Sequence, residues 1–130
     1  MKRVTVICAV NNKYLLMATE CGSINVLLAG QTHISETKQL DSPICAMCHV
    51  FEDFVLMAHE AGFLSCWNLS GGKLDMKHKI KSLVANEVTD LTCSPNVSDR
   101  DVIIASGKGC IFARINEEGY IVEDNFNIYM

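Results

Sequence analysis

The sequence repeats itself with a period of about 40 residues. Shifted by 40, the segment from Val4 to Leu27 aligns without a gap on the segment from Ile44 to Trp67. Identical residues recur along the alignment: Cys8 and Cys48, Val10 and Val50, 16–18 and 56–58, Glu20 and Glu60, and Gly22 and Gly62. A third copy begins near Val88 and is less regular, since the interval from Gly62 to Gly109 is 47 residues. Periods of this size are typical of repeat architectures, so the 130 residues divide into about three similar units.

Each unit consists of short segments that have the composition of β-strands. In the first unit these are Val4–Val10, Tyr14–Thr19, Ser23–Ala29 and Ile34–Leu40, and turns that contain Asn or Gly separate them. Along the whole chain, the apolar residues alternate as in a strand more clearly than they recur with the period of a helix. We therefore predict an all-β chain with four antiparallel strands in each unit. The predicted unit boundaries are 1–41, 42–86 and 87–130.

The fourth predicted strand of the second unit alternates most clearly. Its two sides are Leu74, Met76, His78 and Ile80, against Lys73, Asp75, Lys77, Lys79 and Lys81. Since successive side chains of a strand point to opposite faces, we expect one apolar and one charged face. The charged row could bind an acidic protein, a phosphoinositide or nucleic acid, but edge lysines also keep an exposed strand from pairing with another chain. We favour this second role.

The stretch from Glu60 to Leu69 resembles the third strand of a WD-repeat blade, in which a Gly-containing turn leads into a strand that ends on Trp-Asp. The preceding residues, 55–59, resemble the second strand of that family's blade. Three differences are present: the family's Gly-His pair is missing, Asn68 replaces the Asp, and Leu27 and Arg114 stand where the second unit has Trp67. The resemblance covers nearly the whole chain and implies a β-propeller of the WD-repeat type with about three blades.

The resemblance also implies a function, that of a non-catalytic scaffold for protein–protein interaction. In this family, the turns from second to third strand and from fourth to first strand form a rim that binds peptides or protein domains. Mapped onto this sequence, the rim contains Glu20, Asp41, Ser42, Glu60 and Lys108. Because Glu20 and Glu60 occupy the same position in two units, the rim suits peptides that carry Lys or Arg.

Three blades are too few for a closed ring, since propellers typically have 4 to 8. Each blade buries its faces only against its neighbours, so an open array leaves two apolar flanks exposed. We expect the missing neighbours to come from one of two sources. Either the chain is a segment of a longer propeller, or a second copy of the chain completes a ring of about six blades.

One stretch suggests an alternative function. Cys45-Ala46-Met47-Cys48-His49 has the form of a c-type haem attachment site and could also contribute to a zinc site, giving a metal- or haem-binding redox protein. The stretch lies in a predicted strand, where Cys45 and Cys48 point to opposite faces, and no second cysteine pair offers matching zinc spacing. We therefore predict buried, reduced thiols and neither a metal nor a cofactor.

Composition restricts the remaining function classes. A net charge of −4 argues against nucleic acid or an anionic membrane as partner, because both are bound through basic surfaces. The apolar runs are far shorter than the roughly 18 to 20 residues of a membrane-spanning helix. Seven cysteines without a convincing export signal suggest a cytoplasmic protein, with a nuclear location as the other option. No phosphate-binding loop, nucleophile elbow or paired-carboxylate motif indicates an enzyme.

Overall fold

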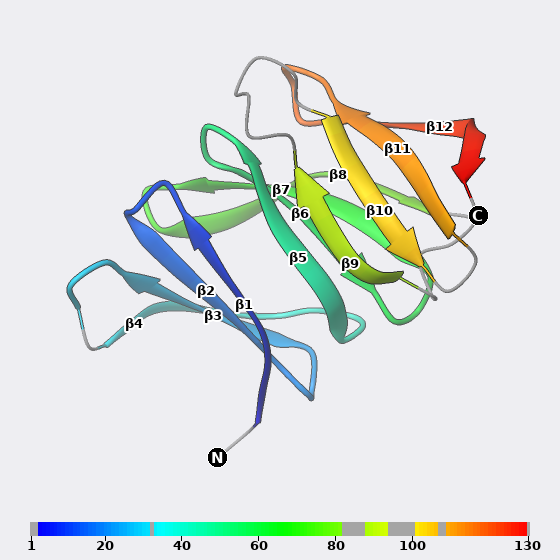
Figure 1. Cartoon of the computed structure of the whole chain (residues 1–130). Helices are drawn as coiled ribbons and strands as arrows, with labels where there is room; N and C mark the ends of the chain where they lie inside the picture. The colour runs from blue at the N-terminus through cyan, green and yellow to red at the C-terminus, as the bar shows by residue number, and fades with distance from the viewer. Residues whose placement is uncertain (1–2, 32, 82–87, 94–100, 107–108, 130) are drawn as a thin grey trace.

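The computed structural model describes residues 3–31, 33–81, 88–93, 101–106 and 109–129. The residues in these ranges form strands, turns and bends, and none of them is helical. The strands form three antiparallel sheets of four, which we call blades 1, 2 and 3. In Figure 1 the blades stand side by side in chain order, with blade 2 in the middle. The predicted all-β architecture with four strands to each unit is therefore confirmed.

Each blade is built from consecutive strands that pair in chain order. Blade 1 contains β1 (Val4–Val10), β2 (Tyr14–Thr19), β3 (Ser23–Leu28) and β4 (Ile34–Gln39). Blade 2 contains β5 (Ile44–Phe51), β6 (Phe54–His59), β7 (Phe63–Ser70) and β8 (Lys73–Lys81). Blade 3 contains β9 (Val88–Cys93), β10 (Asp101–Ser106), β11 (Gly109–Ile115) and β12 (Ile121–Tyr129).

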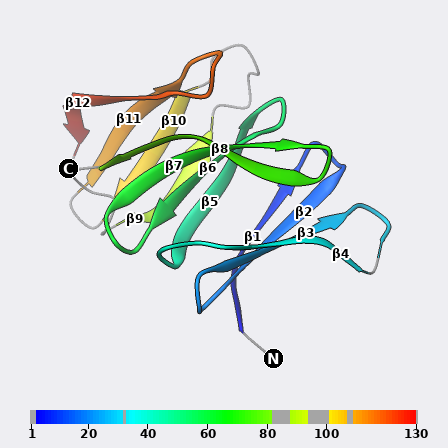
Figure 2. The ribbon, with the colours of Figure 1, turned by 180° about the vertical axis from the view of Figure 1, so that it is seen from behind.

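The apolar core lies between the blades, in two layers. One layer joins blades 1 and 2 and includes Cys8, Leu16 and Val26 of blade 1 with Met57 and Trp67 of blade 2. The other joins blades 2 and 3 through the opposite face of blade 2, with contributions that include Cys48, Leu56, Leu64, Val102 and Ile115. Figure 2 shows blade 2 from behind, between its two neighbours. Because both of its faces are covered, every residue of β6 is buried.

The sequence repeat is also a repeat of backbone hydrogen bonds. The amide of Glu20 donates to the carbonyl of Arg3 at 3.0 Å, and forty residues later the amide of Glu60 donates to that of Pro43 at 2.9 Å. In the turns that follow, Gly22 and Gly62 have φ values of +88° and +96°, a region that favours glycine. The two units therefore share their turn geometry as well as their strand pattern.

The strand β8 differs from its predicted two-sided pattern. Its pairing with β7 shifts register between Cys66 and Trp67, so that His78 lies opposite Cys66 whereas Met76 lies opposite Trp67. Such a bulge inserts one residue and reverses the direction of the side chains beyond it. The apolar residues of β8 are thus divided: Leu74 packs in the layer toward blade 1, and Ile80 packs against the layer toward blade 3. The expectation of one continuous apolar face was wrong.

A tight turn after β11 attaches blade 3 to the outer part of blade 2. The amide of Ile121 donates to Nδ1 of His78 at 2.8 Å, and the rings of His78 and Tyr120 lie 4.8 Å apart. Gly119 in this turn has φ +88°, and a Cβ added there would lie 2.6 Å from Cε1 of Phe54. Only glycine fits between the turn and the Phe54 ring.

Replacing Gly119 with Ala should therefore lower the free energy of unfolding by about 2 to 4 kcal/mol, which combines the strain of a positive φ with overpacking against Phe54. The matched control is Gly30→Ala, because Gly30 has φ +79° and nothing within 4 Å of the added Cβ. The control should lose only about 1 to 2 kcal/mol. Urea denaturation measures both values, and equal losses would contradict the contact.

Candidate interaction surfaces

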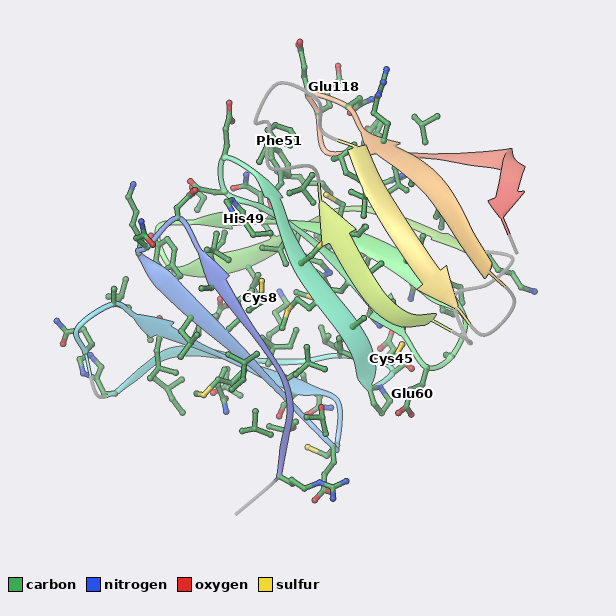
Figure 3. All side chains as sticks on the ribbon, in the orientation of Figure 1. Cys8, Cys45, His49, Phe51, Glu60 and Glu118 are labelled. Atoms are coloured by element: carbon green, nitrogen blue, oxygen red, sulfur yellow. The ribbon has the colours of Figure 1, made fainter. Side chains whose placement is uncertain are left out.

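The predicted rim residues of blades 1 and 2 lie in turns that contact one another. Glu20 lies in the β2–β3 turn, Asp41 and Ser42 lie between β4 and β5, and Glu60 lies in the β6–β7 turn. The amide of Leu40 donates to the carbonyl of Gly22 at 2.9 Å, and the amide of Ala61 donates to Oγ of Ser42 at 3.0 Å. In Figure 3, Glu60 lies at one end of blade 2, and Phe51 and Glu118 lie toward the other end. Lys108 lies outside the described residues.

The side chains of these four residues face different surroundings. Glu20, Asp41 and Glu60 are exposed carboxylates. Glu20 lies 3.6 Å from Nε of Arg3, and Asp41 lies 3.7 Å from Nζ of Lys79. Ser42 is buried and links the β4–β5 connection to the β6–β7 turn. The carboxylates thus remain available to a partner as predicted rim residues, whereas Ser42 holds two turns together.

A buried chain of hydrogen bonds lies directly behind the rim. Nε1 of Trp67 donates to Oγ of Ser65 at 2.7 Å, and Oγ of Ser65 lies 2.6 Å from Nε2 of His59. The His59 ring also forms a hydrogen bond with the backbone of Ser42. If the Ser65 hydroxyl donates to His59, all four groups are satisfied with a neutral imidazole that donates to the Ser42 carbonyl. Polar groups from three segments are therefore paired inside an apolar layer.

The surroundings of His59 favour this neutral form. Burial is the largest influence and lowers the pKa of His59 below its ordinary value of 6.5. The hydrogen bond to Ser42 and the carboxylate of Asp41 act in the opposite direction, and the ammonium of Lys79 again lowers the pKa. The imidazole therefore stays uncharged at neutral pH and serves as a structural link.

In front of this chain, a groove of about 160 Å³ opens between the outer strands of blades 1 and 2. Its lining is mainly apolar and comes from β4, the β4–β5 connection, the end of β6, the β6–β7 turn, β7 and β8: Lys38, Gln39, Leu40, Asp41, Ser42, His59, Ala61, Phe63, Trp67, Met76 and Lys79. Met76 lines the groove and is 48% exposed, although it lies on the same side of the bulge in β8 as buried Leu74. A methionine at an open surface is adaptable to different bound shapes.

Two lysines carry positive charge into the groove. Nζ of Lys38 lies 5.6 Å from the centre of the Trp67 ring, and Nζ of Lys79 lies 4.5 Å from the centre of the Phe63 ring. Both distances are within the range of a cation–π contact. Lys38 also donates to the carbonyl of Leu74 at 3.4 Å. The groove therefore combines aromatic surface with two ammonium groups.

A second candidate surface is the face of blade 1 that points away from blade 2. It carries Ile7, Leu15, Met17, Leu27 and Ala29, and Ile7 is 60% exposed. Shifted by 40 residues, these positions become Met47, Val55, Met57, Trp67 and Leu69, which pack in the layer between blades 1 and 2 and are each at most 8% exposed. The same five positions are thus apolar in both units, but only in blade 2 are they covered.

The cysteine motif lies in β5, but not as predicted. A register shift between Ile44 and Ala46 brings Cys45 and Cys48 against the same apolar layer, so the expectation of opposite faces was wrong. Burial raises the pKa of Cys45, whereas metal ligation needs the thiolate. Nε2 of His49 lies 2.6 Å from the Glu52 carbonyl. Among the described residues, no three His, Cys, Asp or Glu side chains are arranged to hold a metal ion.

Comparison with known proteins gives a fold. The sequence matches no protein-family model and no curated protein. The structure is similar to that of Sqt1 from Saccharomyces cerevisiae, at a TM-score of 0.76 and 13% identity over 94% of this chain and 34% of that one. It is also similar to the Cps50 (Swd1) β-propeller domain of Myceliophteria thermophila, at a TM-score of 0.69 and 13% identity over 95% of this chain and 39% of that one. For BamB from Moraxella catarrhalis the TM-score is 0.72 and the identity 14%, over 94% of this chain and 37% of that one.

These similarities confirm the predicted β-propeller fold. The chain spans 34% to 39% of the length of these structures. No helix among the described residues is long and apolar enough to cross a membrane.

Two parts of the site were not predicted from the sequence. One is the pair of His59 and Ser65, although a histidine and a serine within otherwise apolar strands indicate a buried polar pair. The other is Lys38, because the groove forms between two repeat units and no spacing within one unit reveals it.

The lowered pKa of His59 predicts a dependence of stability on pH. In the unfolded chain His59 takes up a proton near pH 6.5, whereas the folded state resists protonation until lower pH. The free energy of unfolding should therefore fall as the pH decreases from 7 through about 6. In His59→Gln, the part of this pH dependence that His59 causes should vanish, while the carboxylates should still contribute to the change of the free energy of unfolding with pH. Urea denaturation between pH 5 and 8 tests this, and parallel profiles for the two proteins would contradict it.

Proposed function

We propose that this chain is a non-catalytic scaffold for protein–protein interaction, which binds a protein or peptide partner at the rim shared by blades 1 and 2. The observation that carries the proposal is the groove of about 160 Å³ beside the rim, with aromatic, aliphatic and cationic side chains in its lining. Binding sites are typically concave and mainly apolar with a few placed polar groups. The propeller fold of the structural neighbours supports a scaffold role.

The rim is rigid where it adjoins the groove, which suits recognition. The chain of hydrogen bonds from Trp67 through Ser65 and His59 to Ser42 fixes one wall of the groove to the rim turns. A site whose side chains are held before binding loses less conformational entropy when the partner arrives. Asp41 and Glu60 add exposed carboxylates next to the opening.

We further propose that the open face of blade 1 is covered by another propeller blade. Its five apolar positions repeat those with which blade 2 covers blade 1, so the face has the composition of a blade junction. For the 130-residue chain by itself, a second copy supplies that blade. In a longer polypeptide, the preceding blade supplies it.

The rim proposal predicts site-specific crosslinking in cells. A photoreactive amino acid at position 41 or 60 should give discrete adducts with a protein partner, because both positions are exposed beside the groove. The matched control is the same probe at position 118, which is exposed in the β11–β12 turn of blade 3, far from Glu60 in Figure 3. Mass spectrometry of the adducts identifies the partner. Equal adducts at all three positions, or none at 41 and 60, would count against the rim.

The second proposal predicts self-association of the isolated chain. Sedimentation velocity at micromolar concentration should show species larger than a monomer, since apolar surface drives association. Ile7→Lys and Met17→Lys should each shift the chain to the monomer, because a buried unpaired charge is costly. A third variant, Val122→Lys, places the charge at an exposed position of blade 3 and tests whether that part of blade 3 forms the other side of the contact. A wild-type chain that stays a monomer and exposes no dye-binding apolar surface would refute the proposed junction.

A further inference from the structure

We propose that the groove between blades 1 and 2 selects a segment of its partner in which one apolar side chain is flanked by carboxylates. This inference names the ligand chemistry of the groove and rests on the proposed scaffold function. The apolar side chain would lie against Leu40, Phe63 and Met76, while the carboxylates would pair with Lys38 and Lys79. Each part of this assignment follows from a separate property of the groove.

The size of the groove defines the apolar part of the ligand. A cavity of about 150 Å³ with apolar walls accepts a molecule as large as benzene. The groove, at about 160 Å³, therefore accommodates one leucine, isoleucine or phenylalanine side chain but not two. Trp67 is only 5% exposed and forms the base, and half-exposed Met76 can adapt its shape to the inserted group.

The charge of the groove defines the flanking groups. Two ammonium groups line it, on Lys38 and Lys79, against one carboxylate, on Asp41. The wall strand β8 carries four lysines and a single acidic residue, Asp75, whose carboxylate is already engaged by Lys77 at 2.8 Å. On the neighbouring strand β4, Glu36 accepts a hydrogen bond from the amide of Leu74 at 2.7 Å. Lysines thus outnumber carboxylates in the groove lining and on β8, although the chain as a whole carries −4.

The ammonium groups of Lys38 and Lys79 can exchange their present contacts for a carboxylate of the ligand. The contact of Lys79 with Asp41 is long, at 3.7 Å, and the Asp41 side chain is 95% exposed, so a bound carboxylate competes with a weak pair. No described carboxylate lies within 4 Å of Nζ of Lys38, which contacts the Trp67 ring and the Leu74 carbonyl. Asp75 acts on Lys38 only at longer range, so a carboxylate on the ligand gives Lys38 an ion pair within 4 Å that the described residues do not provide.

The groove provides its own reporter for the test. Trp67 is the single tryptophan of the sequence and lies at the base of the groove, so its fluorescence responds to occupation of this site alone. We would titrate the full chain with the peptide acetyl-Asp-Glu-Leu-Asp-Glu-amide at low and at physiological salt. Binding should change the tryptophan emission and should weaken as salt increases, because the contacts are partly exposed.

Three peptides test the chemistry separately. Replacement of the central Leu by Gly removes the apolar group, replacement of Asp and Glu by Asn and Gln removes the charge, and acetyl-Lys-Lys-Leu-Lys-Lys-amide reverses it. Each should bind at least about threefold more weakly than the parent peptide. Equal binding of the basic peptide, or no response to the acidic one, would overturn the proposal.

Protein variants place the contact. Lys38→Gln and Lys79→Gln should each weaken binding of the acidic peptide about two- to fivefold, which is the upper part of the range for exposed ion pairs. The matched controls are Lys73→Gln and Lys81→Gln, at exposed positions of the same strand β8 that do not line the groove. The controls should lose less than about twofold. If all four variants behave alike, the peptide binds by general charge attraction and the assigned groove is wrong.

The outcome is separable from that of the rim proposal. Crosslinks at positions 41 and 60 without binding of the acidic peptide would leave the scaffold role intact and reject only the ligand class. Binding of the peptide without a crosslinked protein in cells would support the groove chemistry and reject a protein partner at the rim.

Discussion

Face-to-face burial of neighbouring sheets is the interaction on which the whole structure depends. Each sheet has little core of its own, and its apolar side chains become buried only when a second sheet covers them. Blade 2 is covered on both faces, and its strand β6 is completely buried. The outward face of blade 1 has the same apolar positions without a cover, and Ile7 is exposed there. The groove also results from this arrangement, because it is the space that remains where two twisted sheets diverge toward their outer strands.

The strands could be predicted closely because their signals are local. Alternating residues and glycine or asparagine turns placed β1 to β4 to within one residue of their observed ends. The bulges at Lys77 and near Cys45 could not be predicted in this way, since a bulge is a property of pairing between strands rather than of one strand. At Lys77 the bulge divided an apolar row that the sequence presents as continuous, and near Cys45 it brought two cysteines to one layer. The repeat alignment places equivalent positions together but contains no information about an inserted residue in one partner.

The candidate site was less predictable than the fold because it is assembled from two units. The family resemblance implies which turns form the rim, so Glu20, Asp41, Ser42 and Glu60 could be named from the sequence, and the structure places them in contacting turns. The groove requires Lys38 of one blade and Lys79 of the next, which are 41 positions apart and belong to no common motif. The tryptophan that carried the family resemblance has a double role, since it packs in the junction and supplies the base of the groove.

The open face of blade 1 gives the array a direction. Blades 1 and 2 each have one face of the kind formed by Cys8, Leu16 and Val26 and another of the kind formed by Met47, Met57 and Trp67, and the junction between these blades joins unlike faces. A contact between unlike faces is heterologous, so it either closes on itself as a ring or continues as an open filament. Two copies that met through their open blade 1 faces would pair two faces of the same kind. Neither face would then meet the kind of face that covers it between blades 1 and 2. The angle between successive blades, rather than the strength of their contact, therefore decides whether such an array stays finite.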